Sequence, residues 1–311
     1  MQRTAKMVRG RHWKERLQWF TMALPAIVLR ALFAYLPMFG IVLAFKQYKV
    51  SDGIFGSKWI GFKNFEFFIK SQDAWRVTRN TLGLNFLFIF TGTACAVIFA
   101  FMMYEVKKAM HIKIYQTVSI LPKFLSWVAV SYITYALLDP TKGIINRVIE
   151  SFGGEGVAWY SRTAAPYWPV ILMIVHIWHS MGMSSILYFA ALMGVDNELF
   201  EAAEIDGAGK LQKTIYISLP SVVPIIVITT ILNVGSIFRA DFGLFYNVTN
   251  DIGALYSTTD VIDTYVYRAL MTLGDIGMGS AVGIVQSVVC TITIVTTNAV
   301  VKKISPENTL F

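Results

Sequence analysis

One compact polar stretch, residues 196–220, separates two long apolar runs and carries several carboxylates around a GAGK tetrapeptide at 207–210. The tetrapeptide resembles part of a phosphate-binding loop. A Walker A loop, however, needs Gly three residues before Gly207 and Ser or Thr directly after Lys210. The chain has Glu204 and Leu211 at those positions, so we predict no nucleotide site and no enzymatic activity in this chain.

The other residues that often perform chemistry are scattered. His176 and His179 share a helical face and would suit a metal ion, but no third ligand accompanies them, so we predict no metal site. The patterns H-E-x-x-H and G-x-S-x-G and paired carboxylates within apolar runs do not occur in the sequence. Cys95 and Cys290 lie inside apolar runs without disulfide or metal spacing. These patterns favour binding or transport over catalysis.

Residues 197–206 are predicted to form a short helix outside the lipid. Asp196 and Asn197 are typical N-cap residues, and Gly207 and Gly209 favour the end of a helix. Acids suit the positive end of the helix dipole, and small apolar residues give the helix one narrow face. The residues concerned are Glu198, Glu201, Glu204, Leu199, Ala202 and Ala203.

The elements that position these residues are predicted to be membrane-spanning helices. Of the 311 residues, 55% are hydrophobic and 15% are charged, with a mean hydropathy of +0.56; a soluble domain carries about 25% charged residues. Six segments reach the roughly 20 apolar residues that a spanning helix needs: 22–45, 80–104, 114–138, 167–194, 221–242 and 276–301. We predict an all-α polytopic membrane protein with a basic N-terminal arm (1–21), a six-helix transmembrane domain (22–301) and a C-terminal tail (302–311). In the sixth segment, the G-x-x-x-G pair Gly279 and Gly283 predicts close packing against a neighbouring helix.

Basic residues concentrate in the N-terminal arm, in the short loop after the second segment and near the C-terminus. An even number of spans places these regions on one side together with residues 196–220, and the positive-inside rule makes that side cytoplasmic. The loop 46–79, with seven basic residues, falls on the opposite side and conflicts with the rule. The net charge of +8 is spread over loops and termini, so we expect membrane lipid and no nucleic acid as the partner of these charges.

The polar stretch resembles the EAA loop of permease subunits in binding-protein-dependent ABC importers. The resemblance lies in E-A-A-x-x-D-G-A followed by I-x-L-P, at Glu201, Ala202, Ala203, Asp206, Gly207, Ala208, Ile217, Leu219 and Pro220. It extends along nearly the whole chain: W-x-G-x-x-N at 59–64, N-T-L at 80–82, LPKFLSWV at 121–128 and TTDVIDTYVYR at 258–268. The last two are similar to the LplB-like polysaccharide and oligosaccharide branch of MalF-type sugar permeases.

The resemblance implies a MalF/MetI-like, type I importer fold with six spans and a cytoplasmic coupling helix between the fourth and fifth. It implies a second, non-identical permease subunit, two ATP-binding subunits that hold ATP and Mg, and an extracytoplasmic solute-binding protein or lipoprotein. This chain would then carry no cofactor and lie in the bacterial cytoplasmic membrane with both termini cytoplasmic. The residues implied in coupling to the ATPase are Glu198, Leu199, Glu201, Ala202, Ala203, Asp206, Gly207 and Ala208.

A carbohydrate pathway needs aromatic faces together with hydrogen-bonding side chains. The third, fourth and fifth spans and the residues just after them offer such a set, unusually polar for lipid-facing helix. The candidates are Lys123, Trp178, His179, Ser184, Tyr188, Asn233, Ser236, Phe238, Arg239 and Asp241. One interpretation pairs Arg239 with Asp241 at the outer mouth; an alternative hypothesis has Arg239 and Lys123 attract an acidic sugar.

Two other functions stay open at this point. The EAA loop indicates an ATPase partner but does not identify the transported solute, so an ABC permease for a non-sugar solute is equally consistent with it. A stand-alone secondary transporter or channel is a further alternative. The acids lie almost entirely in loops, which argues against a proton relay inside the spans.

Overall fold

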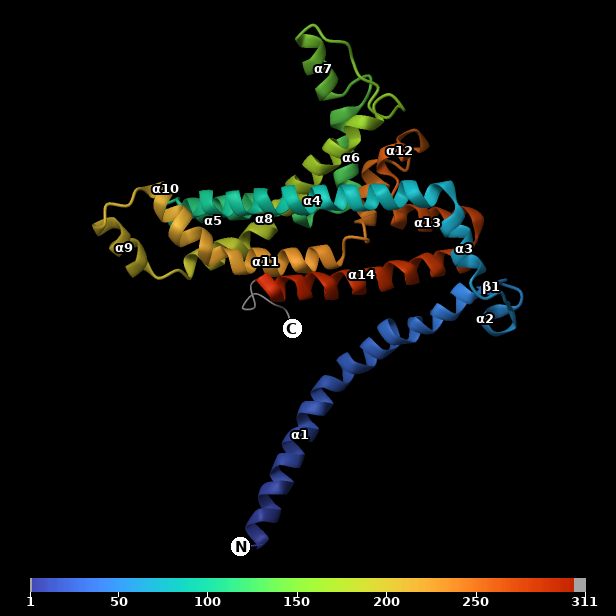
Figure 1. Ribbon diagram of the computed structural model, residues 1–311, viewed down its shortest axis with the longest axis horizontal. Helices are drawn as coiled ribbons and strands as arrows, with labels where there is room; N and C mark the ends of the chain where they lie inside the picture. The colour runs from blue at the N-terminus through green and yellow to red at the C-terminus, as the bar shows by residue number, and fades with distance from the viewer. Residues whose placement is uncertain (1, 305–311) are drawn as a thin grey trace.

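The computed structural model describes residues 2–304 and is an elongated bundle of long helices (Figure 1). The helices from the N-terminus to the middle of the chain are α1 (Gln2–Arg30), α2 (Gly53–Gly56), α3 (Lys63–Lys70), α4 (Gln72–Tyr104), α5 (Ala109–Ile120), α6 (Trp127–Leu138), α7 (Ile144–Ser151) and α8 (Trp168–Met193). The remainder are α9 (Asn197–Ile205), α10 (Lys210–Lys213), α11 (Leu219–Gly235), α12 (Tyr256–Thr259), α13 (Ile262–Leu273) and α14 (Ile276–Ile304). Short 3-10 and π turns join them: η1 (Ala31–Tyr35), η2 (Leu36–Phe45), η3 (Leu121–Phe124), η4 (Ala165–Tyr167), η5 (Thr214–Ser218), η6 (Leu244–Val248) and η7 (Gly253–Leu255).

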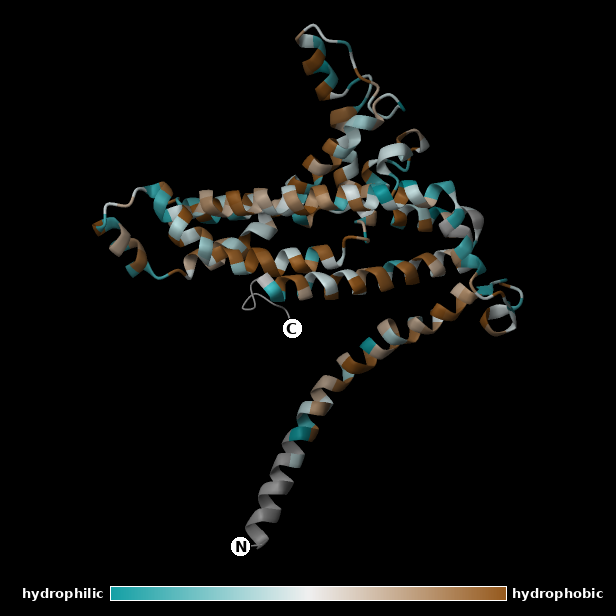
Figure 2. Ribbon diagram, viewed as in Figure 1, coloured by the Kyte–Doolittle hydropathy of each residue, from teal (hydrophilic) through white to brown (hydrophobic). Residues whose placement is uncertain are grey.

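Within residues 2–304, five continuous helical segments are long and apolar enough to cross a membrane: Arg16–Phe45, Gln72–Tyr104, Ala165–Met193, Lys210–Gly235 and Ile276–Lys303. Hydrophobic residues make up most of their length, and hydrophilic residues gather around α9 and α10 and near residues 46–59 (Figure 2). A sixth candidate is the pair Ala109–Phe124 and Trp127–Leu138, which bends by 98° at its break. The predicted all-α class is confirmed, and five of the six predicted spans overlap these continuous segments.

The third predicted span is not one continuous helix. Pro122 lacks a backbone donor, Leu125 adopts an extended conformation, and the hydroxyl of Ser126 caps α6 by accepting from the N–H of Ala129 at 3.2 Å. The break leaves the Leu125 carbonyl outside any helix, and the ring Nε2 of His179 in α8 lies 3.2 Å from it. Because an unpaired carbonyl is costly in lipid, this contact stabilises the corner.

The fifth span is shifted toward the N-terminus relative to the prediction of 221–242. Helical structure begins at Lys210 and ends at Gly235, where a Cβ would lie 2.9 Å from the Ile294 side chain of α14. Residues 236–241 leave the helix and cross to the region of α13. The polar residues near the end of the predicted span therefore lie on irregular backbone and not on a helix.

The first span packs against little of its own chain. α1 leads away from the bundle, and only its continuation η2 packs on α14 (Figure 1). None of the most apolar part of Arg16–Phe45 is buried. Large side chains such as Trp19, Met22 and Phe33 are 72%, 76% and 77% exposed. This apolar surface requires lipid or another subunit to cover it. The side chains of residues 1–12, and residues 305–311 of the predicted tail, lie outside the described part.

A two-stranded hairpin, β1 (Lys46–Gln47) with β2 (Lys58–Trp59), closes the outer end of the first span. Asn64, from the W-x-G-x-x-N stretch, donates to the carbonyls of Ala44 and Lys46 at 2.9 and 3.1 Å. Trp59 stacks on Phe45 with ring centroids 5.6 Å apart. The stretch therefore fastens the hairpin to the helix end.

The predicted glycine pair in α14 has two different roles. A Cβ at Gly279 would lie 2.8 Å from Leu270, so this glycine permits close contact between α14 and α13. A Cβ at Gly283 would meet nothing within 4 Å. The prediction of close helix packing therefore holds at Gly279 and is wrong at Gly283.

A buried acid joins α4 to α13 at the end of the bundle opposite α9 (Figure 1). Asp260, whose side chain is 0% exposed, binds Arg76 at 2.9 Å and Arg268 at 2.6 Å. Its backbone carbonyl accepts from Asn80 of the N-T-L sequence at 3.0 Å. Part of the positive charge of the loop 46–79 is thus engaged within the chain: besides Arg76, Lys70 pairs with Glu66.

Candidate translocation cavity and coupling helix

The coupling helix α9 forms where the polar stretch predicted a helix. The side chain of Asp196 caps its start by accepting from the backbone N–H of Glu198 at 3.0 Å. At its end, Gly207 has a φ of +77°, which suits glycine, and the Ala208 N–H donates to the Ala203 carbonyl at 2.8 Å. The observed range, Asn197–Ile205, is one residue shorter than predicted.

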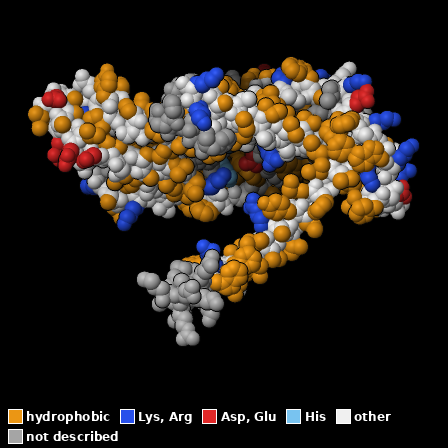
Figure 3. Space-filling view, turned by 60° about the horizontal axis from the view of Figure 1, so that its bottom comes forward, with side chains coloured by type: hydrophobic (Ala, Val, Ile, Leu, Met, Phe, Trp, Pro, Cys, Tyr) orange, Lys and Arg blue, Asp and Glu red, His pale blue; other side chains and the backbone are white. Residues whose placement is uncertain are grey.

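α9 lies at one end of the molecule, with acidic side chains gathered around it (Figures 1 and 3). It is attached to its own chain by Phe200, which packs near Tyr104 (ring centroids 6.3 Å apart), and by the Glu204–Lys213 pair at 3.4 Å. Ile205 is 87% exposed. Of the eight predicted coupling residues, Ala203 and Ala208 are half-buried, and the others are exposed: Glu198, Leu199, Glu201, Ala202, Asp206 and Gly207.

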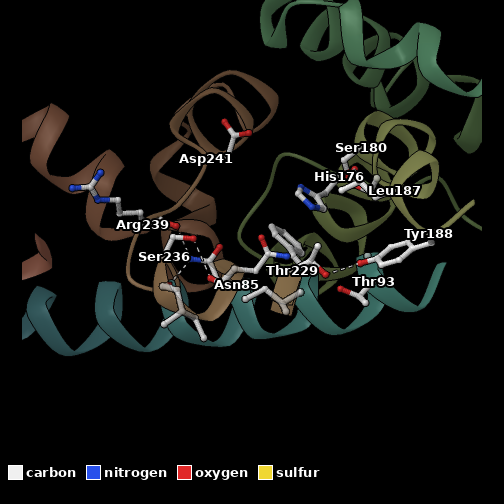
Figure 4. Close-up of a pocket in the computed structure, with 16 residues that line it drawn as sticks. Asn85, Thr93, His176, Ser180, Leu187, Tyr188, Thr229, Ser236, Arg239 and Asp241 are labelled. Carbon is white, nitrogen blue, oxygen red and sulfur yellow. Dashed lines mark hydrogen bonds between the residues drawn. The ribbon is translucent and has the colours of Figure 1, made fainter. Parts of the chain in front are cut away.

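A cavity of about 390 Å³, lined by both apolar and polar side chains, lies between α4, α8, α11 and the segment that follows α11 (Figure 4). Figure 3 shows a hollow in the bundle with basic, acidic and histidine side chains at its edge. Six of the ten predicted pathway residues line the cavity: Ser184, Tyr188, Asn233, Ser236, Arg239 and Asp241. This volume falls in the range of about 300–1,000 Å³ that is typical of small-molecule sites.

The structure does not place the other four predicted pathway residues in this cavity. Lys123 is exposed on η3 beside the break in the third span, and Trp178 is 42% exposed on α8. His179 is buried against Trp127, with ring centroids 4.0 Å apart, and stabilises the corner of the third span. Phe238 packs into an apolar cluster with Val77 and its neighbours because its backbone, not being helical, turns the ring away from the cavity.

Sequence reasoning missed the contribution of α4. This helix lines the cavity with Asn85, Phe88, Ile89, Gly92 and Thr93. Positions 85, 89, 92 and 93 follow the i, i+4, i+7, i+8 spacing of one helix face, and two of them are polar. That spacing was the available signal. The other lining residues outside the predicted set are His176, Ser180, Leu187, Thr229 and Ile237.

Residues 237–240, which we call the strap, run as irregular backbone along the outer edge of the cavity. Asn85 of α4 donates through Nδ2 to the carbonyls of Ile237 and Arg239 at 2.7 and 2.9 Å. Gln286 of α14 donates to the carbonyl of Phe238 at 2.9 Å. Three consecutive carbonyls that no helix satisfies are thus bonded by two side chains from different helices.

A third side chain fixes the end of the strap. The carboxylate of Asp263, in the first turn of α13, accepts from the backbone N–H of Ala240 at 2.8 Å and from Gln286 at 3.3 Å. Burial raises the pKa of the Asp263 carboxyl above its usual range. The strap is therefore fixed from α4, α13 and α14 at once.

The predicted pair between Arg239 and Asp241 is wrong. The carboxylate of Asp241 caps η6 by accepting from the N–H groups of Gly243 and Leu244 at 3.1 and 3.4 Å. The guanidinium of Arg239 donates instead to Ser287 of α14 at 3.3 Å, and the two side chains point apart in Figure 4. The irregular backbone between them turns the two side chains to different sides.

At the opposite end of the cavity, α8 and α11 are joined by a hydrogen bond of 3.0 Å between the hydroxyls of Tyr188 and Thr229. His176 stacks on Phe88 with ring centroids 4.7 Å apart. The cavity thus presents hydroxyl, amide and aromatic groups along a bundle whose outer surface is apolar. A multi-pass membrane protein with such a cavity and an exposed polar helix at one end has the architecture of a transport permease.

The comparisons with known proteins agree with this class. LplB of Bacillus subtilis is 35% identical over 94% of this chain and 91% of its own length. The polygalacturonan/rhamnogalacturonan transport system permease YteP of the same species is 34% identical over 93% of this chain and 88% of its own. No protein-family model matches the sequence. The chain belongs to the family of ABC-importer permease subunits that these relatives represent.

Solved structures give the same result. A chain of the crystal structure of a bacterial ABC transporter that imports the acidic polysaccharide alginate superposes with a TM-score of 0.85 at 31% identity, covering 95% of this chain and 99% of its own. The same TM-score, at 30% identity, relates this chain to the alginate transporter in complex with its periplasmic protein bound to an alginate pentasaccharide. The fold predicted from the EAA-loop resemblance is confirmed.

Proposed function

We propose that this chain forms one half of the translocation pathway of an ATP-driven importer for carbohydrate, an oligosaccharide or polysaccharide fragment. The observation that carries the proposal is the presence in one bundle of a hydroxyl- and amide-lined cavity and an exposed, well-capped α9. The names of the pectic and alginate relatives support carbohydrate as the cargo. A solute-binding protein outside the membrane delivers it, as in the alginate transporter complex.

A second, non-identical permease subunit supplies the other half of the pathway, and two separate subunits bind and hydrolyse ATP with Mg. The exposed part of α9, where an ATP-binding subunit can contact it, carries Glu198, Leu199 and Glu201. This chain carries the motion and supplies no catalytic group for hydrolysis.

The path of the motion follows from the shape of the fifth span. Helical structure from Lys210 to Gly235 covers 26 residues, which at 1.5 Å per residue is about 39 Å. Its first residue, Lys210, follows α9 after a turn of four residues, and Asn233 near its end lines the cavity. A displacement of α9 is thus transmitted through this short turn and then along one helical segment to the cavity.

The chain lies in a bacterial cytoplasmic membrane with α9 and both termini on the cytoplasmic side. The C-terminal end of α14 lies toward the α9 end of the bundle, whereas the hairpin, α12 and α13 lie toward the other (Figure 1). The basic residues of the N-terminal arm and of the short loop after α4 favour this orientation under the positive-inside rule, whereas those of the loop 46–79 oppose it. The basic residues of the inner termini, such as Lys302 and Lys303, are exposed.

The proposal is tested by co-expressing the chain with its second permease subunit, ATPase and binding protein and reconstituting the complex in liposomes. Glu201→Lys or Gly207→Pro should lower ATP-driven oligosaccharide uptake roughly 5- to 150-fold, the usual range of a coupling free energy between two sites. Glu155→Lys makes the same charge reversal on an exposed residue of the outer loop and is the control. Uptake at the wild-type rate by both coupling variants would refute the role of α9. Import of a non-carbohydrate solute alone would refute the cargo.

A further inference from the structure

Arg239 lacks the ion pairs that Arg76 and Arg268 form near the end of the bundle opposite α9. Arg76 and Arg268 each hold two carboxylates, with Asp260 shared between them. Among the side chains that the structure describes, no carboxylate lies within ion-pair distance of Arg239, and its guanidinium makes a hydrogen bond of 3.3 Å to the neutral hydroxyl of Ser287. The side chain is exposed at the edge of the cavity. An arginine in this position keeps its capacity for an anion.

The backbone that carries Arg239 is held from three other elements. Asn85 bonds the carbonyl of Arg239 itself, Gln286 bonds the preceding carbonyl, and Asp263 bonds the following N–H group. Irregular backbone needs its polar groups satisfied in any case, and the same bonds also fix the place from which the Arg239 side chain extends. Anchoring from three elements preorganises the group, which is the arrangement that binding sites use.

There is also room for a ligand beside the guanidinium. Ser287 and Gly283 are four residues apart and therefore lie on the same face of α14, and the Ser287 hydroxyl donates to the Gly283 carbonyl at 2.8 Å. A Cβ at Gly283 would meet no atom of this chain within 4 Å, and the cavity itself reaches Arg239. Ser236 and Asn233 add hydroxyl and amide groups on the cavity side of the strap.

A planar guanidinium with free N–H groups binds a carboxylate in a bidentate manner, and neighbouring hydroxyl and amide groups suit the hydroxyls of a sugar ring. We propose that Arg239, held by the strap, binds the carboxylate of a uronic-acid unit of the cargo, and that Asn85, Asp263 and Gln286 position it. This inference rests on the proposed function and narrows it from carbohydrate to acidic carbohydrate.

The other charged candidates do not serve this subsite. Asp241, the acid that lines the cavity, has its carboxylate occupied by two N–H groups and points away from Arg239. Lys123 lies outside the cavity lining. The subsite therefore depends on one cation, and a single substitution tests it.

The test compares two probes of equal length and linkage: an oligogalacturonate and the neutral oligosaccharide made by reducing its carboxyl groups. ATP-driven uptake of each into liposomes is measured for the complete complex with its binding protein. Arg239→Gln should lower kcat/KM for the acidic probe roughly 10- to 100-fold, the loss expected for hydrogen bonds to a charged group, and change the neutral probe less than about twofold. Arg147→Gln removes an exposed positive charge from α7 and is the matched control.

Positioning is tested with Gln286→Leu, which removes the donor to the Phe238 carbonyl and leaves Arg239 in place. It should lower the ratio of acidic to neutral uptake in the same direction as Arg239→Gln, with Arg239→Lys retaining part of the ratio. A purely structural role for Gln286 would lower both probes equally and would refute positioning.

Equal effects of Arg239→Gln on both probes would refute the carboxylate subsite, and so would import of the neutral probe alone by the wild-type transporter. Neither result would contradict the proposed function as a carbohydrate importer. Wild-type import of neither probe nor any other oligosaccharide, while a different solute is taken up, would refute the proposed function itself.

Discussion

Asp260→Asn is the perturbation that most directly tests how the outer end of this bundle is held together. The change is nearly isosteric and removes one charge from a side chain that is 0% exposed. Arg76 and Arg268, 32% and 20% exposed, then face a neutral amide in place of the carboxylate that they share. The side-chain amide of Asn would also point N–H groups toward the N–H groups of the two arginines, which is unfavourable.

The expected loss of stability depends on which carboxylate partner each arginine retains. Removing one partner of a buried ion pair costs about 3–5 kcal/mol. Arg76 retains Asp73 at 2.7 Å and Arg268 retains Asp251 at 2.9 Å, so neither guanidinium loses all its compensation. We therefore expect the lower end, about 3 kcal/mol, which for a chain of this size corresponds to a drop in Tm of roughly 6–12 °C.

The assay is thermal unfolding of the purified transporter in detergent at neutral pH, followed by intrinsic tryptophan fluorescence. Asp73→Asn is the matched control: its side chain is 43% exposed and holds one of the same arginines, so its loss should be below about 1 kcal/mol. An Asp260→Asn protein that melts within 2 °C of wild type, or no lower than Asp73→Asn, would refute the view that this buried carboxylate holds α4 to α13.

Two further predictions concern packing and pH. Gly182→Ala should strongly reduce the yield of folded protein, because a Cβ there would lie 2.0 Å from the Ser119 carbonyl oxygen where α8 crosses α5. Gly83→Ala, whose Cβ would meet nothing within 4 Å, is the control in size-exclusion profiles, and equal yields would contradict the close crossing. Burial raises the pKa of Asp263, so the folded state favours the protonated carboxyl, and stability should fall as pH rises from about 4 through the raised pKa. Asp263→Asn should flatten that part of the Tm–pH curve, and an unchanged slope would contradict the assignment.

The local features of this protein were predictable where a single stretch of chain determines them. Asp196 as a cap, Gly207 at a positive φ and the helix between them depend on neighbours in sequence, and α9 forms within one residue of the prediction. The spans depend on length and hydropathy, which a bilayer imposes directly. These properties need no knowledge of tertiary contacts.

The incorrect predictions concern places where contacts with distant parts of the chain determine the local structure. Leu125 leaves the helix although its surroundings are apolar, and the partner of its carbonyl, His179, is 54 residues away. The strap is stable because Asn85 and Gln286 satisfy its carbonyls from other helices. The polarity of Asn85 was visible in the sequence, but its use was not, because hydropathy does not tell which polar residue within a span faces an unsatisfied carbonyl.

The detached first span has a consequence for how cells must make this transporter. The part of this span before η2 finds almost no contact within its own polypeptide, so lipid must cover its apolar surface until another subunit packs against it. Synthesis of the two unlike permease chains in matched amounts would favour the replacement of lipid by protein along this helix.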